Sequence, residues 1–366
     1  MAWIALHMAA SYCPFGVFLN RATLVLHGIL SRTPLGLGAF LSRCAAKERS
    51  GGRCPASLPH YSESCVAALG MTIRNAKAGI LVVRNLEKGT PMTVPMIALN
   101  NGMAIPQIGL GTWPLTDETV VPAVVAAIDA GYRHIDTAAR YGNERGVGEG
   151  IRASGIAREQ LFVTTKLDGA YQGNDRAIAG LDEALERLGL AYVDLLLIHW
   201  PLPQRGEFIS TWQTFEKLVA AGKTRAIGVS NFKPAHLEQL LAAATIPPAV
   251  NQIQLNPYTT RPEHRAYNAA HGIVTVSWGP LAPRTALLEH PTLAALGARY
   301  NKTAAQIVLR WHVELGLVAI PKSATAKRIA QNIDIFDFAL TADEMAAITA
   351  IDTGAEPGVD SDTQGH

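Results

Sequence analysis

The sequence from residue 92 onwards predicts a (β/α)8 barrel, the TIM barrel fold, in which eight parallel strands are each followed by a helix. Two observations carry this prediction. Short apolar runs of strand length alternate, eight times over, with segments whose apolar residues recur at the helical period. The stretch 92–366 is also long enough, since such a barrel needs about 250 residues. Strands that alternate with helices pair in parallel through right-handed crossovers.

The first expected element is a hairpin before the barrel. Val94–Leu99 has the pattern of a short strand, and Asn100-Asn101-Gly102 follows as a turn, because Asn and Gly tolerate a positive φ. The barrel strands are expected at Ile108–Thr112, His134–Thr137, Leu161–Thr165, Val193–His199, Ala226–Val229, Val250–Gln254, Ile273–Ser277 and Leu317–Pro321. Helices are expected at Glu118–Ala130, Arg176–Leu188, Thr211–Ala221, Ala235–Ala243, Pro262–His271, Pro291–Tyr300 and Ala326–Asn332. A last helix near Ala342–Ile351 precedes a polar tail, Gly354–His366, which we expect to be flexible.

The alternative architecture is an open, doubly wound sheet. That fold favours a Gly-x-Gly-x-x-Gly turn after a strand. Gly109-Leu-Gly111 is followed by Thr-Trp-Pro-Leu, and Gly146-Val-Gly148-Glu-Gly150 has the wrong spacing. The barrel therefore remains the better prediction.

Composition excludes several classes of protein. Of the 366 residues, 48% are hydrophobic, which is ample for a packed core and argues against disorder. A net charge of +2 gives no electrostatic case for nucleic-acid binding. No run of 18 apolar residues has the pattern of a membrane span.

Residues 1–91 differ from the rest of the chain. They hold ten Lys and Arg, only three acids, and all four cysteines, whose spacing lacks the C-x-x-C pairs of a zinc site. One interpretation is a targeting peptide, because the stretch is poor in acids and contains Arg and Ser. The favoured interpretation is an extension, disordered or owed to a mis-assigned start, before a single domain at 92–366.

Four titratable side chains follow three consecutive strands. Asp136 ends the second barrel strand and Tyr141 lies in the loop after it, while Lys166 and His199 end the third and fourth strands. Singly, each has a structural interpretation, as a helix cap, packing, a solvated charge or a hydrogen-bonded core residue. A barrel places all four at one rim, where active sites lie, and together they favour a functional site.

A lysine and an aspartate beside a tyrosine form an acid–base device. The reference pKa of tyrosine is near 10, and an adjacent ammonium lowers it by stabilising tyrosinate. We therefore expect a lowered pKa for Tyr141, with Asp136 holding Lys166 charged. His199 could donate a hydrogen bond to a carbonyl oxygen on which negative charge develops.

These residues carry a family resemblance. The segments His134-Ile-Asp-Thr-Ala-Ala-Arg-Tyr-Gly-Asn-Glu144, Thr165-Lys166 and Leu197-Ile-His-Trp-Pro201 resemble three signature blocks of the aldo-keto reductases, and the similarity covers residues 92–366. The stretches 92–102 and Ser277-Trp-Gly-Pro-Leu281 resemble the bacterial 2,5-diketo-D-gluconate reductase group in particular. The resemblance implies a barrel that reduces carbonyls with NAD(P)H. It makes Tyr141 the proton donor, tuned by Lys166 and Asp136, and gives His199 the orientation of the substrate carbonyl.

The same resemblance implies a cofactor site along the second half of the barrel. Ser230, Asn231 and Gln252 supply the donors and acceptors that a nicotinamide carboxamide needs, and Trp278 offers an aromatic face for its ring. Lys322, Ser323 and Arg328 resemble an adenosine-phosphate site, and two cations there favour NADPH over NADH. The remaining residues that the resemblance assigns to the cofactor are Thr112, Gly279, Leu281, Gln331 and Asn332.

For the substrate, the resemblance implies an apolar pocket walled by Trp113 and Trp200, with His199 as a third substrate residue that orients the carbonyl. The expected reaction is NADPH-dependent reduction of a ketone or aldehyde such as 2,5-diketo-D-gluconate or methylglyoxal. The alternative is a non-catalytic NADP-binding regulatory module on the same barrel. We expect a cytoplasmic monomer that binds a small carbonyl compound, with no metal, nucleic acid or membrane, since no H-E-x-x-H or paired Cys/His motif occurs.

Overall fold

The computed structural model describes residues 6–7, 71–72, 80–81, 84–85, 94–354 and 359–366. The chain divides into two compact units, Met1–Thr90 and Pro91–His366. In the first unit, β1 (Leu6–His7) pairs with β3 (Ile80–Leu81), and β2 (Met71–Thr72) pairs with β4 (Arg84–Asn85), both antiparallel. The four cysteines, and most of the predicted extension at 1–91, lie outside the described residues.

The second unit contains the predicted barrel. Its eight strands are all parallel and lie in chain order: β7 (Leu110–Gly111), β8 (His134–Asp136), β9 (Phe162–Leu167), β10 (Val193–Ile198), β11 (Thr224–Ser230), β12 (Val250–Gln254), β13 (Val274–Trp278) and β14 (Val318–Ile320). Parallel bridges join Ile108 to Ala319 and Gly111 to Lys322, so the last strand meets the first. The sheet is therefore a closed cylinder, and the open-sheet alternative is excluded.

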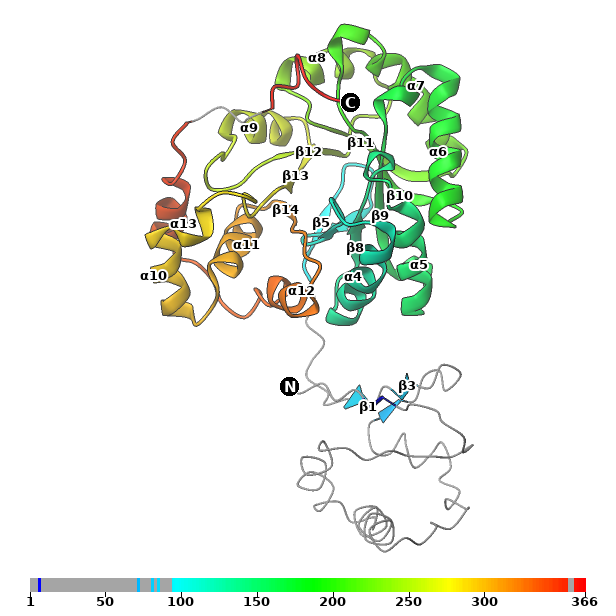
Figure 1. Ribbon diagram of the computed structural model, residues 1–366. Coiled ribbons are helices and arrows are strands. Elements are labelled where there is room, and N and C mark those ends of the chain that lie inside the picture. Colours follow the sequence, from blue (N-terminus) through cyan, green and yellow to red (C-terminus); the bar gives the residue numbers. More distant parts are fainter. Residues whose placement is uncertain (1–5, 8–70, 73–79, 82–83, 86–93, 355–358) are drawn as a thin grey trace, which may run out of the picture. The chain divides into compact units, whose positions relative to one another are not determined.

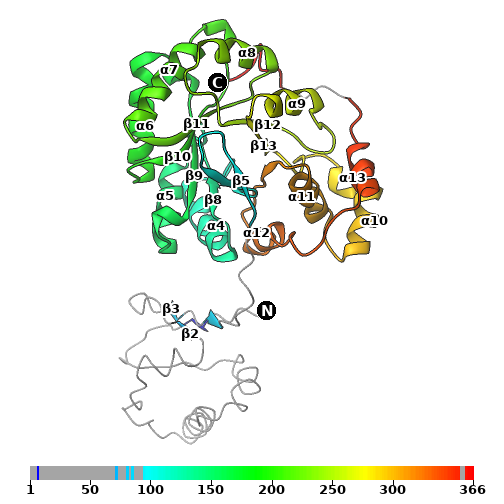
Figure 2. The same cartoon turned by 180° about the vertical axis from the view of Figure 1, so that it is seen from behind.

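Helices surround this cylinder on its outside (Figure 1). They are α4 (Asp117–Ala130), α5 (Glu144–Ser154), α6 (Asn174–Leu188), α7 (Phe208–Ala220), α8 (Pro234–Ala243), α9 (Pro262–Ala270), α10 (Pro291–Tyr300), α11 (Ala304–Glu314), α12 (Ala326–Ile333) and α13 (Ala342–Thr349). The view from behind shows the same ring of helices around the strands (Figure 2). None of the helices in the described part of the chain is both long and apolar enough to cross a bilayer.

A short hairpin closes the amino-terminal end of the cylinder, as the turn sequence predicts. It consists of β5 (Met96–Ala98) and β6 (Ala104–Pro106), and its Gly102 has a φ of 83°. Asn100 Nδ2 donates a 2.9 Å hydrogen bond to the carbonyl oxygen of Pro248, just before β12. Ile105 is completely buried and packs inside the barrel. The side chains that follow the strands lie at the opposite, carboxyl-terminal end of the cylinder.

Strand β10 shows why the barrel strands appear as continuous apolar runs. Leu195 and Leu197 face the interior cluster, whereas Leu196 and Ile198 belong to the cluster that packs against the helices. Both faces are buried, so the alternation that marks a half-exposed strand is absent.

Helix α5 is an element that the sequence patterns did not single out. Its three glycines lower its intrinsic helix propensity. They allow close packing on both sides: a Cβ on Gly146 would lie 2.3 Å from the Asp117 carbonyl oxygen of α4, and one on Gly148 would lie 2.0 Å from that of Leu188 in α6. These glycines are therefore required by the contact between neighbouring helices.

Gly148→Ala should destabilise the protein although alanine is the better helix former. The added methyl group overlaps the Leu188 carbonyl, and such overpacking costs about 1–3 kcal/mol. Glu149→Ala is the control, an exposed position in the same helix where we expect a change within about 0.5 kcal/mol. Denaturant unfolding measures both. Equal stabilities of the two variants would contradict the role assigned to the glycine.

Candidate active site

The four predicted catalytic side chains meet at the carboxyl-terminal end of the barrel. Asp136 is the last residue of β8, Lys166 is the penultimate residue of β9, and His199 directly follows β10. Tyr141 ends a short 3-10 turn, η2 (Ala139–Tyr141), after β8. Because β8, β9 and β10 are neighbours in the sheet, their ends bring these groups together.

A buried ion pair forms the centre of the site. The Lys166 Nζ lies 2.5 Å from Asp136 Oδ1, and the two side chains are 1% and 4% exposed. The ammonium also donates to the Thr137 carbonyl oxygen at 3.0 Å and to the Tyr141 hydroxyl at 3.2 Å, which uses its three donors. The other carboxylate oxygen, Asp136 Oδ2, accepts a 2.7 Å hydrogen bond from Gln252 Nε2 of β12. Both charges are thus paired and hydrogen-bonded, as burial requires.

The pKa of Tyr141 is shifted in the direction opposite to the one expected from the sequence. Burial raises the pKa of Tyr141 above its ordinary value, and the Lys166 ammonium offsets this only in part. Burial alone would lower the pKa of Lys166, but Asp136 and Tyr141 together raise it. The prediction of a lowered tyrosine pKa is therefore wrong for this site. The phenol stays protonated at neutral pH beside a lysine that stays charged.

His199 is held neutral. Burial, followed by the charges of Lys166, His366 and Arg140, lowers the pKa of His199 well below its usual range. Its ring lies edge-on to that of Tyr141, with centroids 5.6 Å apart. Its buried Nδ1 has no hydrogen-bond partner among the described residues. A neutral imidazole beside the phenol can donate one N–H to a substrate oxygen without carrying a charge.

Support for this centre comes from residues to which the sequence analysis gave no separate role. Thr137 Oγ1 donates to Asn143 Oδ1 at 2.8 Å, and the buried Asn143 amide donates to two carbonyls of the loop after β7. The buried Glu144 accepts hydrogen bonds from Thr165 at 2.5 Å and Arg187 at 2.7 Å. Thr137, Asn143 and Glu144 all lie in the sequence motif that ends at Glu144. The motif alone does not distinguish residues that support the site from residues that take part in the reaction.

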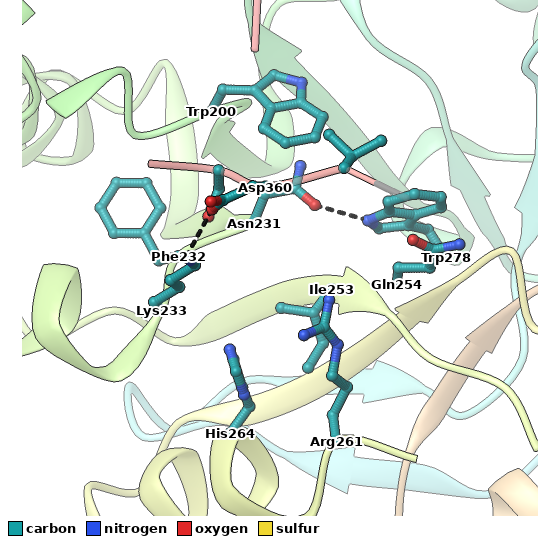
Figure 3. A pocket seen from close by; sticks show the side chains of 12 residues that line it. Trp200, Asn231, Phe232, Lys233, Ile253, Gln254, Arg261, His264, Trp278 and Asp360 are labelled. Atoms are coloured by element: carbon teal, nitrogen blue, oxygen red, sulfur yellow. Dashed lines mark hydrogen bonds and ion pairs between the residues drawn. The ribbon is translucent and has the colours of Figure 1, made fainter. Parts of the chain in front are cut away.

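A cluster of amide and hydroxyl groups lies beside the ion pair. Ser230 Oγ donates to the Gln252 carbonyl oxygen at 2.9 Å, and Asn231 Nδ2 donates to the His199 carbonyl oxygen at 3.0 Å. The indole N–H of Trp278 donates to Asn231 Oδ1 at 2.8 Å, a bond visible in Figure 3. Three strand ends, those of β11, β12 and β13, therefore present polar groups and one half-buried aromatic ring to the same region.

The end of β14 and the start of α12 form a second, exposed cluster. Lys322 and Arg328 are exposed, whereas Ser323 is buried and accepts a 3.2 Å hydrogen bond from the backbone N–H of Thr325, the residue before α12. Arg328 Nε donates to Thr325 Oγ1 at 2.8 Å. Two cations beside a helix amino terminus can hold a phosphate. The other residues expected on the cofactor side are placed as follows: Thr112 and Asn332 are buried, and Gly279, Leu281 and Gln331 are partly buried.

The two tryptophans expected to wall the substrate pocket differ in position. Trp200 is 8% exposed, and its ring is stacked on His199 with centroids 6.4 Å apart. Trp113 is 50% exposed, and the Arg284 guanidinium lies 5.9 Å from its ring centroid. The structure thus places Trp200, and not Trp113, against His199.

A cavity of about 320 Å³ lies beside this site, bordered by Trp200, the residue after His199, and by Asn231 and Trp278 (Figure 3). Barrel residues and the end of the chain line it together: Trp200, Asn231, Phe232, Lys233, Ile253, Gln254, Arg261, His264, Trp278, Val359, Asp360 and Ser361. The presence of tail residues differs from the expectation of a flexible tail. Residues 359–366 pack on the barrel, and the His366 ring lies 4.9 Å from that of His199. Within the described residues, no three His, Cys, Asp or Glu side chains are grouped as metal ligands would be.

Comparison with known proteins identifies the relatives of this architecture. Residues 107–353 match the model of the aldo/keto reductase family. An aldo-keto reductase of Mycobacterium sp. (strain KMS) is 46% identical over 272 residues, which cover 74% of this chain and 98% of that protein. A morphine 6-dehydrogenase of Pseudomonas putida is 45% identical, covering 73% and 94%. The methylglyoxal reductase DkgA of Yersinia pestis is 44% identical, covering 74% and 98%.

Solved structures agree. The crystal structure of an aldo/keto reductase from Brucella melitensis superposes with a TM-score of 0.69 at 48% identity, covering 71% of this chain and all of that one. A Bombyx mori aldo-keto reductase in complex with NADP gives a TM-score of 0.67 at 39% identity, covering 72% and 94%.

Lys166→Met should destabilise the fold by about 3–5 kcal/mol, because it leaves Asp136 buried without its cation. Replacing both partners with apolar residues, Asp136→Leu with Lys166→Met, should cost less than the sum of the single changes. Lys223→Met, which breaks an exposed pair with Asp182, is the control and should cost at most about 1 kcal/mol. Denaturant unfolding of the four variants measures these differences. A loss for Lys166→Met no larger than that of the control would contradict the assignment.

Proposed function

Because this chain belongs to the aldo/keto reductase family, we propose that it reduces a ketone or aldehyde to an alcohol, with NADPH as hydride donor and Tyr141 as proton donor. One observation carries the proposal. The Tyr141 hydroxyl lies 3.2 Å from a buried lysine ammonium that is itself 2.5 Å from Asp136, beside a neutral histidine at the end of the barrel.

The residues present fit a nicotinamide cofactor. Ser230, Asn231 and Gln252 offer the mixture of donors and acceptors that a carboxamide needs, and Trp278 offers an aromatic face beside them. Lys322 and Arg328 would hold the phosphates of the adenosine half. The Bombyx mori relative was crystallised with NADP, which supports the same cofactor for this chain. When bound, NADPH supplies a hydride to the carbonyl carbon.

The chain's own residues then transfer one proton to the substrate. The protonated phenol of Tyr141 donates it to the carbonyl oxygen, on which negative charge develops as the carbon is reduced. The tyrosinate that remains is stabilised by the adjacent Lys166 ammonium, which Asp136 keeps charged. His199, neutral at physiological pH, donates an N–H to the same oxygen and orients it.

We propose a small dicarbonyl as substrate, of the kind represented by methylglyoxal or 2,5-diketo-D-gluconate. Support comes from the DkgA relative named a methylglyoxal reductase and from the polar groups that reach the cavity beside Trp200. A relative of similar identity is named a morphine 6-dehydrogenase, so a panel of carbonyls of different size is the appropriate assay.

Tyr141→Phe should reduce turnover by about 10²–10⁴-fold, because it removes the proton donor and leaves the ring in place. NADPH affinity, measured by fluorescence titration, should stay nearly unchanged. The assay is NADPH oxidation with the carbonyl panel, and normal turnover by this variant would refute the role of Tyr141. Negligible turnover by the wild-type protein that still binds NADPH would favour a regulatory module instead.

Arg328→Ala should weaken NADPH binding about tenfold or more, since a charge-assisted contact to phosphate is worth about 1.5–3 kcal/mol. NADH serves as the matched control, because it lacks the 2′-phosphate that we assign to Arg328 and Lys322. Its affinity for the variant should change little. Equal losses for the two cofactors would remove the argument for NADPH.

A further inference from the structure

The last residues of the chain are anchored on the barrel by an ionic cluster at the start of α8. Lys233 Nζ lies 2.6 Å from both Asp360 Oδ1 and Asp362 Oδ2, and His236 Nε2 lies 2.9 Å from Asp362 Oδ1. We call these four residues the tail latch. Both ribbon views show the end of the chain beside α8 (Figures 1 and 2).

The position of the latch on α8 favours this arrangement. Lys233 is the residue before the helix and His236 lies in its first turn, so the two tail carboxylates sit at the positive end of the helix dipole. The tail is locally ordered to match: the Asp362 N–H donates to Asp360 Oδ1 at 3.0 Å, and the Gln364 N–H donates to the Asp360 carbonyl oxygen at 2.8 Å.

Beyond the latch, the chain end lies against the catalytic histidine. The His366 ring is edge-on to His199, with centroids 4.9 Å apart, and 5.9 Å from that of Trp200. Contacts on either side of this residue are tight. A Cβ on Gly169 would lie 2.7 Å from the His366 carbonyl, and one on Gly365 would lie 3.0 Å from the Trp200 side chain.

Both anchoring points border the cavity, since Lys233 and Asp360 of the latch and Trp200, which His366 contacts, are among its lining residues. The tail contributes Val359, Asp360 and Ser361 to its lining, and the barrel contributes residues that include Trp200 and Trp278. Figure 3 shows Asp360 beside Lys233, joined by the ion pair, at one side of this space. Release of the latch would therefore remove a wall of the cavity without touching the buried ion pair of the catalytic centre.

We propose that Lys233 is a positioning residue, which through the tail latch holds residues 359–366 as a movable wall of the substrate cavity. This inference rests on the proposed carbonyl reduction at His199 and Tyr141. The latch side chains are 34%, 52% and 48% exposed for Lys233, Asp360 and Asp362, so salt screens their attraction. Partly exposed pairs of this kind each contribute at most about 1 kcal/mol, so the latch would hold the wall only weakly.

The first test compares Lys233→Met with Lys217→Met, an exposed lysine on α7, in NADPH oxidation with a carbonyl that the wild-type protein turns over. Lys233→Met should raise KM about three- to tenfold, with kcat and NADPH affinity within about twofold of wild type. Wild-type KM should rise with salt concentration and that of Lys233→Met should not. Lys233→Arg should restore most of the wild-type KM, and the double change Asp360→Asn with Asp362→Asn should mimic Lys233→Met.

A KM for Lys233→Met equal to that of Lys217→Met would overturn the proposal. So would a lower KM, which would mean that the tail obstructs the cavity instead of completing it.

The second test follows amide hydrogen exchange in a peptide that covers residues 359–366 and needs no activity. Lys233→Met should accelerate exchange there and Lys217→Met should not. Equal exchange rates in the two variants would contradict the proposed latch. If the wild-type protein reduced no carbonyl in the panel, the proposed function would be wrong. Accelerated exchange in Lys233→Met would in that case still establish the latch, whereas the proposed effect of the latch on KM would be refuted.

Discussion

The site depends on one buried ion pair. An ammonium and a carboxylate that are 1% and 4% exposed are costly to remove from water, and the cost is offset only if every donor and acceptor is used. Lys166 meets this condition through Asp136, the Thr137 carbonyl and Tyr141, while Gln252 satisfies the second carboxylate oxygen. Such convergence requires neighbouring parallel strands whose ends meet at one rim. The barrel is therefore what makes a permanent, fixed positive charge beside the phenol possible.

Burial and the neighbouring charges together determine the protonation states of Tyr141, Lys166 and His199. Burial raises the pKa of Tyr141 and lowers that of His199, whereas Asp136 and Tyr141 together raise the pKa of Lys166 against the effect of burial. At neutral pH the site thus holds a neutral phenol, a neutral imidazole and a charged ammonium. A phenol with a raised pKa is a weaker acid in the resting site, but it is always present in the donor form. In the proposed mechanism the lysine stabilises the tyrosinate that forms when the proton leaves, so its contribution would grow as the reaction proceeds.

The barrel, and the meeting of the four side chains at its rim, could be predicted from the sequence because each depends on a local pattern. Asp136, Lys166 and His199 each end an apolar run, and parallel strands bring such ends together by topology alone. The direction of the Tyr141 pKa shift could not be predicted, because burial and the charge of Asp136 raise the pKa while Lys166 lowers it, and the balance depends on atoms from several strands. Helix α5 could not be predicted because its glycines lower the helix propensity of the segment. The structure shows that these glycines are needed for close packing against the neighbouring helices. The tail was expected to be flexible because its polar sequence has no period, whereas Lys233 anchors it across a long sequence separation.

The molecule separates strong, buried interactions from weak, exposed ones along the path from the catalytic centre to the cavity. The ion pair of Lys166 is inside the barrel, where water and salt do not screen it. The ion pairs of Lys233 are partly exposed to solvent, which screens their attraction, and side-chain entropy opposes them. In the proposed mechanism, the groups that transfer the proton therefore keep a fixed geometry, whereas the tail that lines the cavity is held by weaker pairs. On this proposal, substitutions in the tail would alter the shape of the cavity beside Trp200 and leave the buried ion pair unchanged.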